Sequence, residues 1–399
     1  MYGSEKEVDK YFLLSVVALT IMGVVMVYSS TALINISRAG AASSSPGGYQ
    51  FMYLKKHLIT LLIAFLSMLL FYSIKPSTLA RYSIVFLVFS FVLLLLVFIP
   101  GLGVKINGAR RWIRVWPSTI QPGEFVKFAM VLFMSRYLSD TQEIRGRFSV
   151  FLWPLIVMLS FQAILLFQPD FGGAFTLGLI TFAMFYISGT PLRFMFTTLL
   201  CVLPVVVKLV MEPYRLKRIF IFLDPWKDPY ASGFQLVQSF IALGNGGFRG
   251  VGLGESKQKL SYLPEVNTDF IFSMVGEEIG FIGVVFVLCM FMLFFSRGIK
   301  IAGDAKSLFA SYLAHGLTLM ITLQALMNIA VVTGLVPTKG LPLPFLSYGG
   351  SSLLVNFIAV SVMLRISRGD DEQLSVQTQD MIIKRRAHLK ARRLRRKAK

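Results

Sequence analysis

The sequence is poor in charged residues, and acidic residues are the scarcer kind. Charged side chains make up 15% of the 399 residues, with 20 Asp and Glu against 40 Lys and Arg, whereas hydrophobic residues make up 55%. A soluble domain of this length needs far more polar surface to face water. The composition therefore excludes a soluble protein and predicts an integral membrane protein.

Cysteine and histidine are nearly absent. Cys201 and Cys289 both lie inside apolar runs, which excludes a disulfide framework and a zinc-binding spacing. The three histidines, His57, His315 and His388, are scattered along the chain, so no histidine-based metal site is expected. Any metal ion would have to be held by carboxylates or by a bound substrate.

The excess of basic residues does not indicate nucleic-acid binding. Ten of the 40 Lys and Arg residues lie in the last 16 residues, KRRAHLKARRLRRKAK, and many others occupy short connections between apolar runs. A basic tail after a last membrane helix is typical of a cytoplasmic segment that faces anionic lipids. We therefore expect residues 369–399 to form a basic cytoplasmic tail whose partners are membrane lipids, and no nucleic acid.

What the sequence has in place of polar surface is a series of long apolar runs. A helix needs about 20 apolar residues to cross a bilayer. The expected spans are residues 11–32, 57–74, 83–100, 119–138, 149–168, 171–189, 192–212, 270–296, 307–333 and 349–367. The first run is too long for a secretory signal and is interpreted as a retained span. The predicted fold is an all-α integral membrane domain of ten helices over residues 1–368, with one long connection at 213–269.

The distribution of Lys and Arg predicts the orientation. Connections on the side of the two termini carry more of them than those on the opposite side, so both termini are expected in the cytoplasm. One short outer connection, residues 101–118, departs from this bias because it carries Lys105, Arg110, Arg111 and Arg114. Cations kept outside against the usual bias suggest an anionic partner at the outer face.

Three acids stand at the start of the eighth expected span. Asp269 is the last charged residue before this apolar run. It could complement the helix dipole or act as a general base, and the residues alone leave both roles open. Glu277 and Glu278 follow within the run. Acids inside a membrane usually face the bundle interior and pair there, so both are interpreted as structural.

Two further polar sets lie in or between apolar runs. Gln121, Glu124 and Lys127 are spaced three residues apart, which places them on one stripe of the fourth span and lets Glu124 neutralise Lys127. Gln168 and Asp170 lie in the short turn QPDFGG, where they are either functional or simple turn residues.

Two segments are expected to depart from regular spans. Residues 334–352, GLVPTKGLPLPFLSYGGSS, hold three prolines and four glycines, so a regular helix is excluded there. Lys339 is the only charge in this segment, either in a polar cavity or at the membrane interface. Apolar residues at helical spacing over 234–241 predict a short amphipathic helix within the long connection.

Five motifs, in order along nearly the whole chain, resemble the SEDS family of bacterial cell-wall polymerases. They are NGARRWI, QPGEFVKF, QPDFGG, YLPEVNTDFIF and PTKGLPLPFLSYGGSS, and the last two are most similar to the FtsW/SpoVE branch, to which RodA is closely related. The resemblance implies a GT-C-like helical glycosyltransferase that polymerises lipid II at the outer face of the bacterial inner membrane. It identifies Asp269 with the essential aspartate of the family, and Arg111 and Lys339 with functional positions.

The implied chemistry joins two lipid II units by one displacement with inversion. Asp269 would take the proton of the acceptor hydroxyl. The leaving diphosphate needs cations, supplied either by basic side chains or by a divalent metal such as Mg²⁺ or Mn²⁺. Residues expected to contact substrate are Arg110, Arg111, Gln121, Glu124, Lys127, Gln168, Asp170, Arg218, Lys339 and Ser347.

Two other function classes stay open. A lipid II flippase would also need a polar cavity and intramembrane charges, but it has no special need for a base such as Asp269 at the outer boundary. A non-catalytic division scaffold leaves the outer cations unexplained. The resemblance further implies a class B penicillin-binding protein, a transpeptidase, as partner, together with divisome or elongation proteins.

Overall fold

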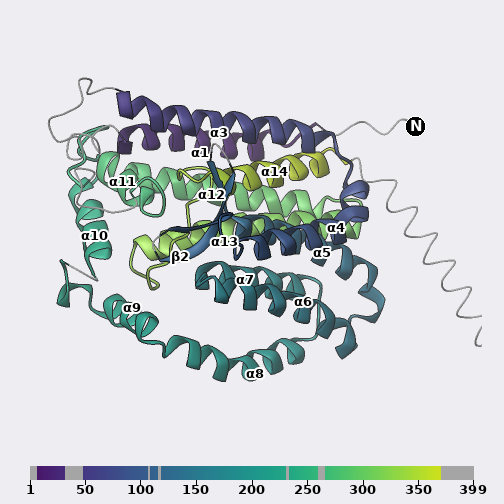
Figure 1. Cartoon of the computed structure of the whole chain (residues 1–399). Helices are drawn as coiled ribbons and strands as arrows, with labels where there is room; N and C mark the ends of the chain where they lie inside the picture. The colour runs from purple at the N-terminus through teal and green to yellow at the C-terminus, as the bar shows by residue number, and fades with distance from the viewer. Residues whose placement is uncertain are drawn as a thin grey trace, which may run out of the picture.

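The computed structural model describes residues 7–31, 48–106, 108–115, 118–230, 233–258 and 266–369. Helices account for nearly all of the regular structure and run mostly side by side in an elongated bundle (Figure 1). Their bounds are α1 Lys10–Thr31, α3 Gly48–Ser73, α4 Pro76–Leu96, α5 Pro122–Asp140, α6 Phe148–Phe167, α7 Phe171–Ile187, α8 Leu192–Val210, α9 Pro213–Leu223, α10 Phe234–Gly246, α11 Ile271–Glu278, α12 Gly280–Gly303, α13 Leu308–Val332 and α14 Gly350–Ser367. The predicted tail from residue 370 onward lies outside the described residues.

Within this described part of the chain, seven helices are long and apolar enough to cross a membrane. They are α1, α3, α4, α6, α12, α13 and α14. Helix α7 and residues Leu192–Pro204 of α8 are apolar but shorter, and α5 carries Glu124 and Lys127 near its start. The composition-based prediction of a multi-span membrane protein is therefore confirmed.

Helix α13 forms the centre of the bundle. It packs against α5, α7, α12 and α14, and side chains along it, including Leu313, Leu317 and Ile321, are completely buried. Helix α3 packs along α14 at one border of the bundle, whereas α8 and α9 form the opposite border in Figure 1.

A small sheet interrupts the helical architecture, so the all-α expectation is wrong for residues 103–120. Strands β1 (Gly103–Ile106), β2 (Ala109–Val115) and β3 (Ser118–Ile120) pair antiparallel in the order β1-β2-β3. Along β2, Ala109 and Ile113 are buried, Arg111 and Trp112 are half-buried, and Arg110 is exposed. This burial does not follow the strict two-residue alternation of a strand signal, so the sheet is defined by its pairing.

The eighth expected span, 270–296, is two helices, and the prediction of a single helix is wrong. Helix α11 ends at Glu278, and α12 begins at Gly280, which adopts a φ of 75° that favours glycine. An added Cβ at Gly280 would lie 2.2 Å from the backbone nitrogen of Gly250. The glycine-rich segment after α10 thus packs directly against the break between α11 and α12.

The long connection is largely structured. Helix α10 is the short helix that apolar spacing predicts, and its buried residues pack against α11. Helix α9 precedes it and was not expected from the sequence. Both lie at one end of the bundle in Figure 1, and Arg218 of α9 donates to the Thr338 carbonyl in the loop between α13 and α14. Residues 231, 232 and 259–265 of this connection lie outside the described residues.

Candidate active site

A cavity of about 310 Å³ lies where β2, α9, α10, the segment before α11 and the loop between α13 and α14 meet. Its described lining combines one carboxylate, three basic side chains, several hydroxyl and amide groups, and three aromatic side chains. These residues are Ala109, Arg111, Trp112, Gln121, Arg218, Gln235, Thr268, Asp269, Phe270, Thr338, Lys339, Gly340, Pro342, Tyr348, Gly349, Ser351 and Ser352. Segments far apart in the sequence therefore converge on one polar site.

Asp269 lies half-buried at the wall of this cavity, just before α11. Its carboxylate lies against Gly340, where an added Cβ would be 2.9 Å from Oδ2 of Asp269. The preceding backbone is fastened to the loop between α13 and α14, because the Tyr348 amide donates to the Asn267 carbonyl at 2.8 Å. Glycine at 340 thus leaves the space that the Asp269 carboxylate occupies.

Lys339 extends from the same loop toward α7. Its ammonium lies 3.8 Å from the ring centroid of Phe175 and 5.4 Å from that of Phe171. Aromatic faces stabilise a cation electrostatically, while burial lowers the pKa of the Lys339 ammonium from 10.5 to about 8. Lys339 is therefore still mostly charged at neutral pH but loses its proton within the range in which enzymes are assayed.

Arg111 is directed into the cavity by β2 and the turn between α6 and α7. Its Nε donates to the Gln168 carbonyl at 3.4 Å, its Nη2 donates to the Pro169 carbonyl, and its Nη1 lies 3.7 Å from Asp170 Oδ1. Asp170 also caps α7 by accepting from the Gly173 amide at 3.0 Å. These contacts orient a guanidinium at the cavity wall.

Arg110 has the opposite placement. It precedes Arg111 on β2, is exposed, and is not among the described cavity residues. The structure thus separates the two arginines that the sequence offers as equal candidates.

Arg218 brings the long connection to the site. It lies on α9, and its Nη1 donates to the Thr338 carbonyl at 3.0 Å, directly beside Lys339 in the chain. A third cationic side chain is thereby held at the same wall. Arg111, Arg218 and Lys339 give the cavity a cluster of positive charge opposite a single described acid, Asp269.

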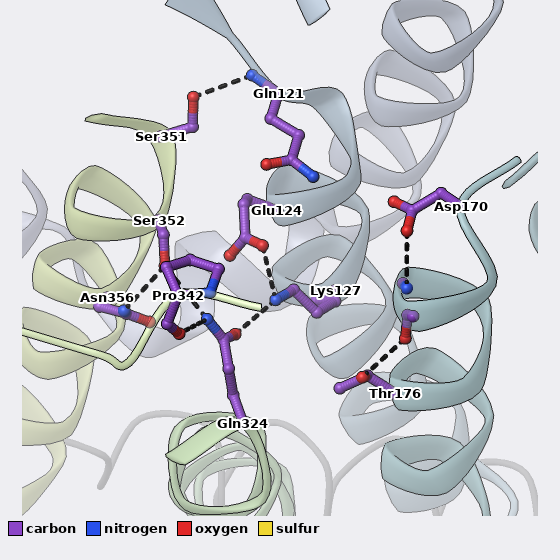
Figure 2. A network of polar contacts seen from close by, with 12 residues as sticks. Gln121, Glu124, Lys127, Asp170, Thr176, Gln324, Pro342, Ser351, Ser352 and Asn356 are labelled. Carbon is purple, nitrogen blue, oxygen red and sulfur yellow. Dashed lines mark hydrogen bonds and ion pairs between the residues drawn. The ribbon is translucent and has the colours of Figure 1, made fainter. Parts of the chain in front are cut away.

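Glu124 and Lys127 form a closed pair behind this cavity. Lys127 Nζ lies 2.8 Å from Glu124 Oε1 and 2.5 Å from Gln324 Oε1, and the charged pair is almost fully buried. Figure 2 shows Gln324 reaching from α13 to Lys127 and, through its Nε2, to the Pro342 carbonyl at 2.9 Å. Neither charged residue of the pair lines the cavity. The cavity lining therefore gives no support to their expected contact with substrate.

The other expected substrate residues divide in the same way. Gln121 lines the cavity, and its backbone N–H donates to Ser351 Oγ at 2.9 Å, as Figure 2 shows. Gln168 is buried and donates to the Leu94 carbonyl at 2.8 Å. Ser347 is also buried and is absent from the described lining; its hydroxyl donates to the Thr268 carbonyl at 2.5 Å. Ser347 therefore joins the two segments that carry Asp269 and Lys339.

Glu277 and Glu278 are completely or almost completely buried on α11. Glu277 accepts from the Ser256 hydroxyl and from the Lys257 amide, the latter at 3.2 Å. Glu278 accepts from the Ser29 hydroxyl of α1 at 2.6 Å. The two acids thus fasten the long connection and α1 to α11, instead of lying deep along a continuous membrane helix.

The described cavity residues do not form a metal cage. Asp269 is the single carboxylate among them, and the described part of the chain contains no group of three His, Cys, Asp or Glu residues able to hold an ion. Hard cations such as Mg²⁺ need several oxygen ligands. The protein groups available to neutralise an anionic ligand are the three basic side chains.

Sequence reasoning missed several cavity residues, including Trp112, Gln235 and Tyr348. Trp112 directly follows Arg111 in the motif NGARRWI, and that proximity was the only signal that could have indicated it. Gln235 lies on α10, where only the apolar spacing was informative. Their position at the site depends on how the elements pack.

Comparison with known proteins gives consistent matches over most of the chain. The model of the FtsW/RodA/SpoVE family, described as cell cycle protein, matches residues 9–372. A probable peptidoglycan glycosyltransferase FtsW of Trichlorobacter lovleyi is 45% identical over 365 residues, covering 91% of this chain and 94% of that protein. Stage V sporulation protein E of Bacillus subtilis is 39% identical over 367 residues, covering 91% and 98%.

Solved structures show the same fold. A chain from a peptidoglycan synthase complex, studied for the coordination of polymerization and crosslinking, superposes with a TM-score of 0.73 at 28% identity, covering 91% of this chain and 98% of the other. The rod shape determining protein RodA of Thermus thermophilus superposes with a TM-score of 0.65 at 24% identity, covering 90% and 97%.

Proposed function

The chain belongs to the FtsW/RodA/SpoVE family of cell cycle proteins, and from this we propose that it is a peptidoglycan glycosyltransferase that polymerises lipid II for cell division. Relatives that match over almost their whole length are named probable peptidoglycan glycosyltransferase FtsW. The observation that carries the proposal is the cavity that one carboxylate, Asp269, lines together with three basic side chains. This combination suits a base and an anionic leaving group.

The same proposal includes the topology. Ten helices cross the bacterial inner membrane in a GT-C-like arrangement: the seven long apolar helices together with α5, α7 and α8. Both termini then lie in the cytoplasm, as the distribution of Lys and Arg favours. The cavity end of the bundle lies at the outer face, which accounts for Arg111 and Arg218 in connections that depart from the usual charge bias.

In the proposed reaction, the acceptor sugar hydroxyl attacks the anomeric carbon of the donor. Asp269 takes the proton of that hydroxyl as the new carbon–oxygen bond forms and the bond to the diphosphate oxygen breaks, with inversion. The undecaprenyl diphosphate leaves with the electron pair. Arg111, Arg218 and Lys339 stabilise the negative charge on it.

We propose that basic side chains, and not a resident metal site, supply this charge compensation. The described lining offers one carboxylate, which is too few ligands for a protein-held Mg²⁺ or Mn²⁺. Polymerisation that depends little on added Mg²⁺ or Mn²⁺ supports this assignment, and an absolute requirement for either ion contradicts it.

The proposed partner is a class B penicillin-binding protein, with lipid II as substrate and other division or elongation proteins around them. Support comes from the similarity to a chain of a peptidoglycan synthase complex in which polymerization and crosslinking are coordinated. The membrane lipids around the bundle complete the expected surroundings.

The test is lipid II polymerisation by the purified protein with a class B penicillin-binding protein, comparing wild type with Asp269→Asn. This change keeps the size and polarity of the side chain and removes the base. Loss of polymer in a folded variant, by about 10²–10⁴-fold, supports the mechanism. Equal polymer from the variant rejects Asp269 as base, and lipid II translocation without polymer from wild type would favour the flippase.

A further inference from the structure

Asn328 on α13 bridges the two segments that carry the acid and the lysine of the cavity. Its Nδ2 donates to the backbone carbonyl of Asp269 at 2.7 Å and to that of Leu341 at 2.7 Å. The side chain is 1% exposed and lies behind the cavity wall. One amide group therefore connects two stretches of non-helical backbone that are distant in the sequence.

The orientation of this amide is fixed by its partners. Both are carbonyl oxygens, which only accept, so the NH₂ group must face them. The Asn328 Oδ1 atom, by contrast, is buried and has no hydrogen-bond partner among the described residues. A buried acceptor without a partner destabilises a protein. Asparagine stands at this position although its Oδ1 acceptor lacks a partner among the described residues. This indicates that the two hydrogen bonds donated by Nδ2 contribute more than the missing bond to Oδ1 costs.

The bridge lies next to the contact between Asp269 and Gly340. Leu341 follows Gly340, the residue against which the Asp269 carboxylate packs, and Lys339 precedes it. Gln324, one helical turn before Asn328 on the same face of α13, holds the next carbonyl, that of Pro342. Of the two bridged segments, Gln324 holds only the loop, and its other bonds go to Lys127 and Ser352. Asn328 holds both the loop and the backbone of Asp269.

We propose that Asn328 is a positioning residue for the glycosyl transfer, a two-donor bridge that sets the distance between the Asp269 carboxylate and the Lys339 ammonium. The inference rests on the proposed polymerase function. A short side chain with two N–H donors on one atom is found only in asparagine. Aspartate has the same shape but at most one donor, and alanine has none.

The experiment compares Asn328→Ala and Asn328→Asp with wild type in lipid II polymerisation. Asn356→Ala is the matched control, because Asn356 is a buried asparagine of α14 whose Nδ2 bonds Ser352 at 3.3 Å and contacts neither segment of the bridge. Thermal unfolding and the stoichiometry of lipid II binding give the fraction of competent molecules, which are those that are folded and bind lipid II. Rates are then expressed per competent molecule, which separates positioning from loss of folded protein.

We expect kcat per competent molecule to fall by about 10²-fold in both Asn328 variants, because small displacements of catalytic groups have effects of this size. KM for lipid II should change by less than about threefold, and the control should stay within about threefold of wild type in both constants. The alkaline fall of kcat/KM should move to higher pH in Asn328→Ala, since a loosened loop admits water to Lys339.

Wild-type kcat in folded Asn328→Ala, or an equal loss in Asn356→Ala, would overturn the inference while leaving the polymerase function intact. Absence of polymer from wild type would instead reject the proposed function. If Asn328→Ala does not fold, Asn328→Ser replaces it, because a hydroxyl keeps one donor. Activity of Asn328→Ser per competent molecule equal to wild type would then contradict the need for two donors, and a loss would support it.

Discussion

The closed pair of Glu124 and Lys127 and the cavity lined by Asp269 and Lys339 lie close together. The charges of the pair bind each other, whereas the charged side chains of the second set line a cavity. In the closed pair, the ammonium lies 2.8 Å from the carboxylate and is further bonded to Gln324, and no part of either charged side chain lines the cavity. In the cavity, acid and lysine lie on irregular segments that are held through their backbones, so both side chains line the hollow.

This difference separates charges that support the structure from charges positioned for a ligand. A buried ion pair that satisfies itself has no capacity left for substrate. A backbone anchor fixes a segment through its main chain, so the anchoring bond itself does not use the side chain. Composition and hydropathy alone cannot distinguish the two cases, because each is an acid and a lysine in an apolar neighbourhood.

Breaking the closed pair should have the largest effect, and it should fall on stability. Lys127→Met keeps the side-chain length but leaves Glu124 buried without its cation, which we expect to destabilise the protein by about 3–5 kcal/mol. Thermal unfolding in detergent measures the loss. The double variant Glu124→Gln/Lys127→Met should recover most of it, and no recovery would contradict the view that the pair serves structure.

Removing the Lys339 cation from the cavity should instead lower activity. Lys339→Met should lower kcat for polymerisation by about 10²–10³-fold, because a charge-stabilising group next to the leaving diphosphate is lost. The melting temperature should stay near that of wild type, since Lys339 makes no ion pair that holds the fold within the described residues. A large loss of stability with unchanged kcat would assign Lys339 to structure, as for Lys127, and would contradict its role toward a ligand.

Gly340→Ala tests the space beside Asp269. The added methyl group would lie 2.9 Å from Oδ2, closer than ordinary contacts allow, so the carboxylate must move. We expect kcat to fall by about 10-fold to 100-fold with little change in folding. Gly349→Ala is the control in the same loop, because its nearest neighbours lie at 3.6 Å or more; equal losses in both variants would argue against a specific effect on Asp269.

The smallest effect expected is on pH dependence. Burial lowers the pKa of the Lys339 ammonium to about 8, so the charge is present below this pH and disappears as pH rises through it. Because kcat/KM reports the free enzyme, it should fall about tenfold per pH unit well above pH 8. Lys339→Arg, which keeps its charge, should remove this alkaline fall from whatever activity it retains; persistence of the fall would assign it to another group.

Particular residues show how far the sequence reaches. The ion pair of Glu124 and Lys127 follows from helical spacing, and the structure contains it. The choice between Arg110 and Arg111 does not follow, because it depends on which face of β2 packs toward the cavity. Gln235 was missed because its only local signal is that of an amphipathic helix.

The sequence by itself determined the class of protein, most of the membrane helices and the candidate acid and cations, since long apolar runs and misplaced charges are local properties of the chain. Only the tertiary structure decided that α11 and α12 separate at Gly280, that residues 103–120 form a sheet, and that Ser347 and Asn328 hold backbone behind the cavity. Each of these depends on contacts between segments far apart in the chain, whose free energy no local pattern contains.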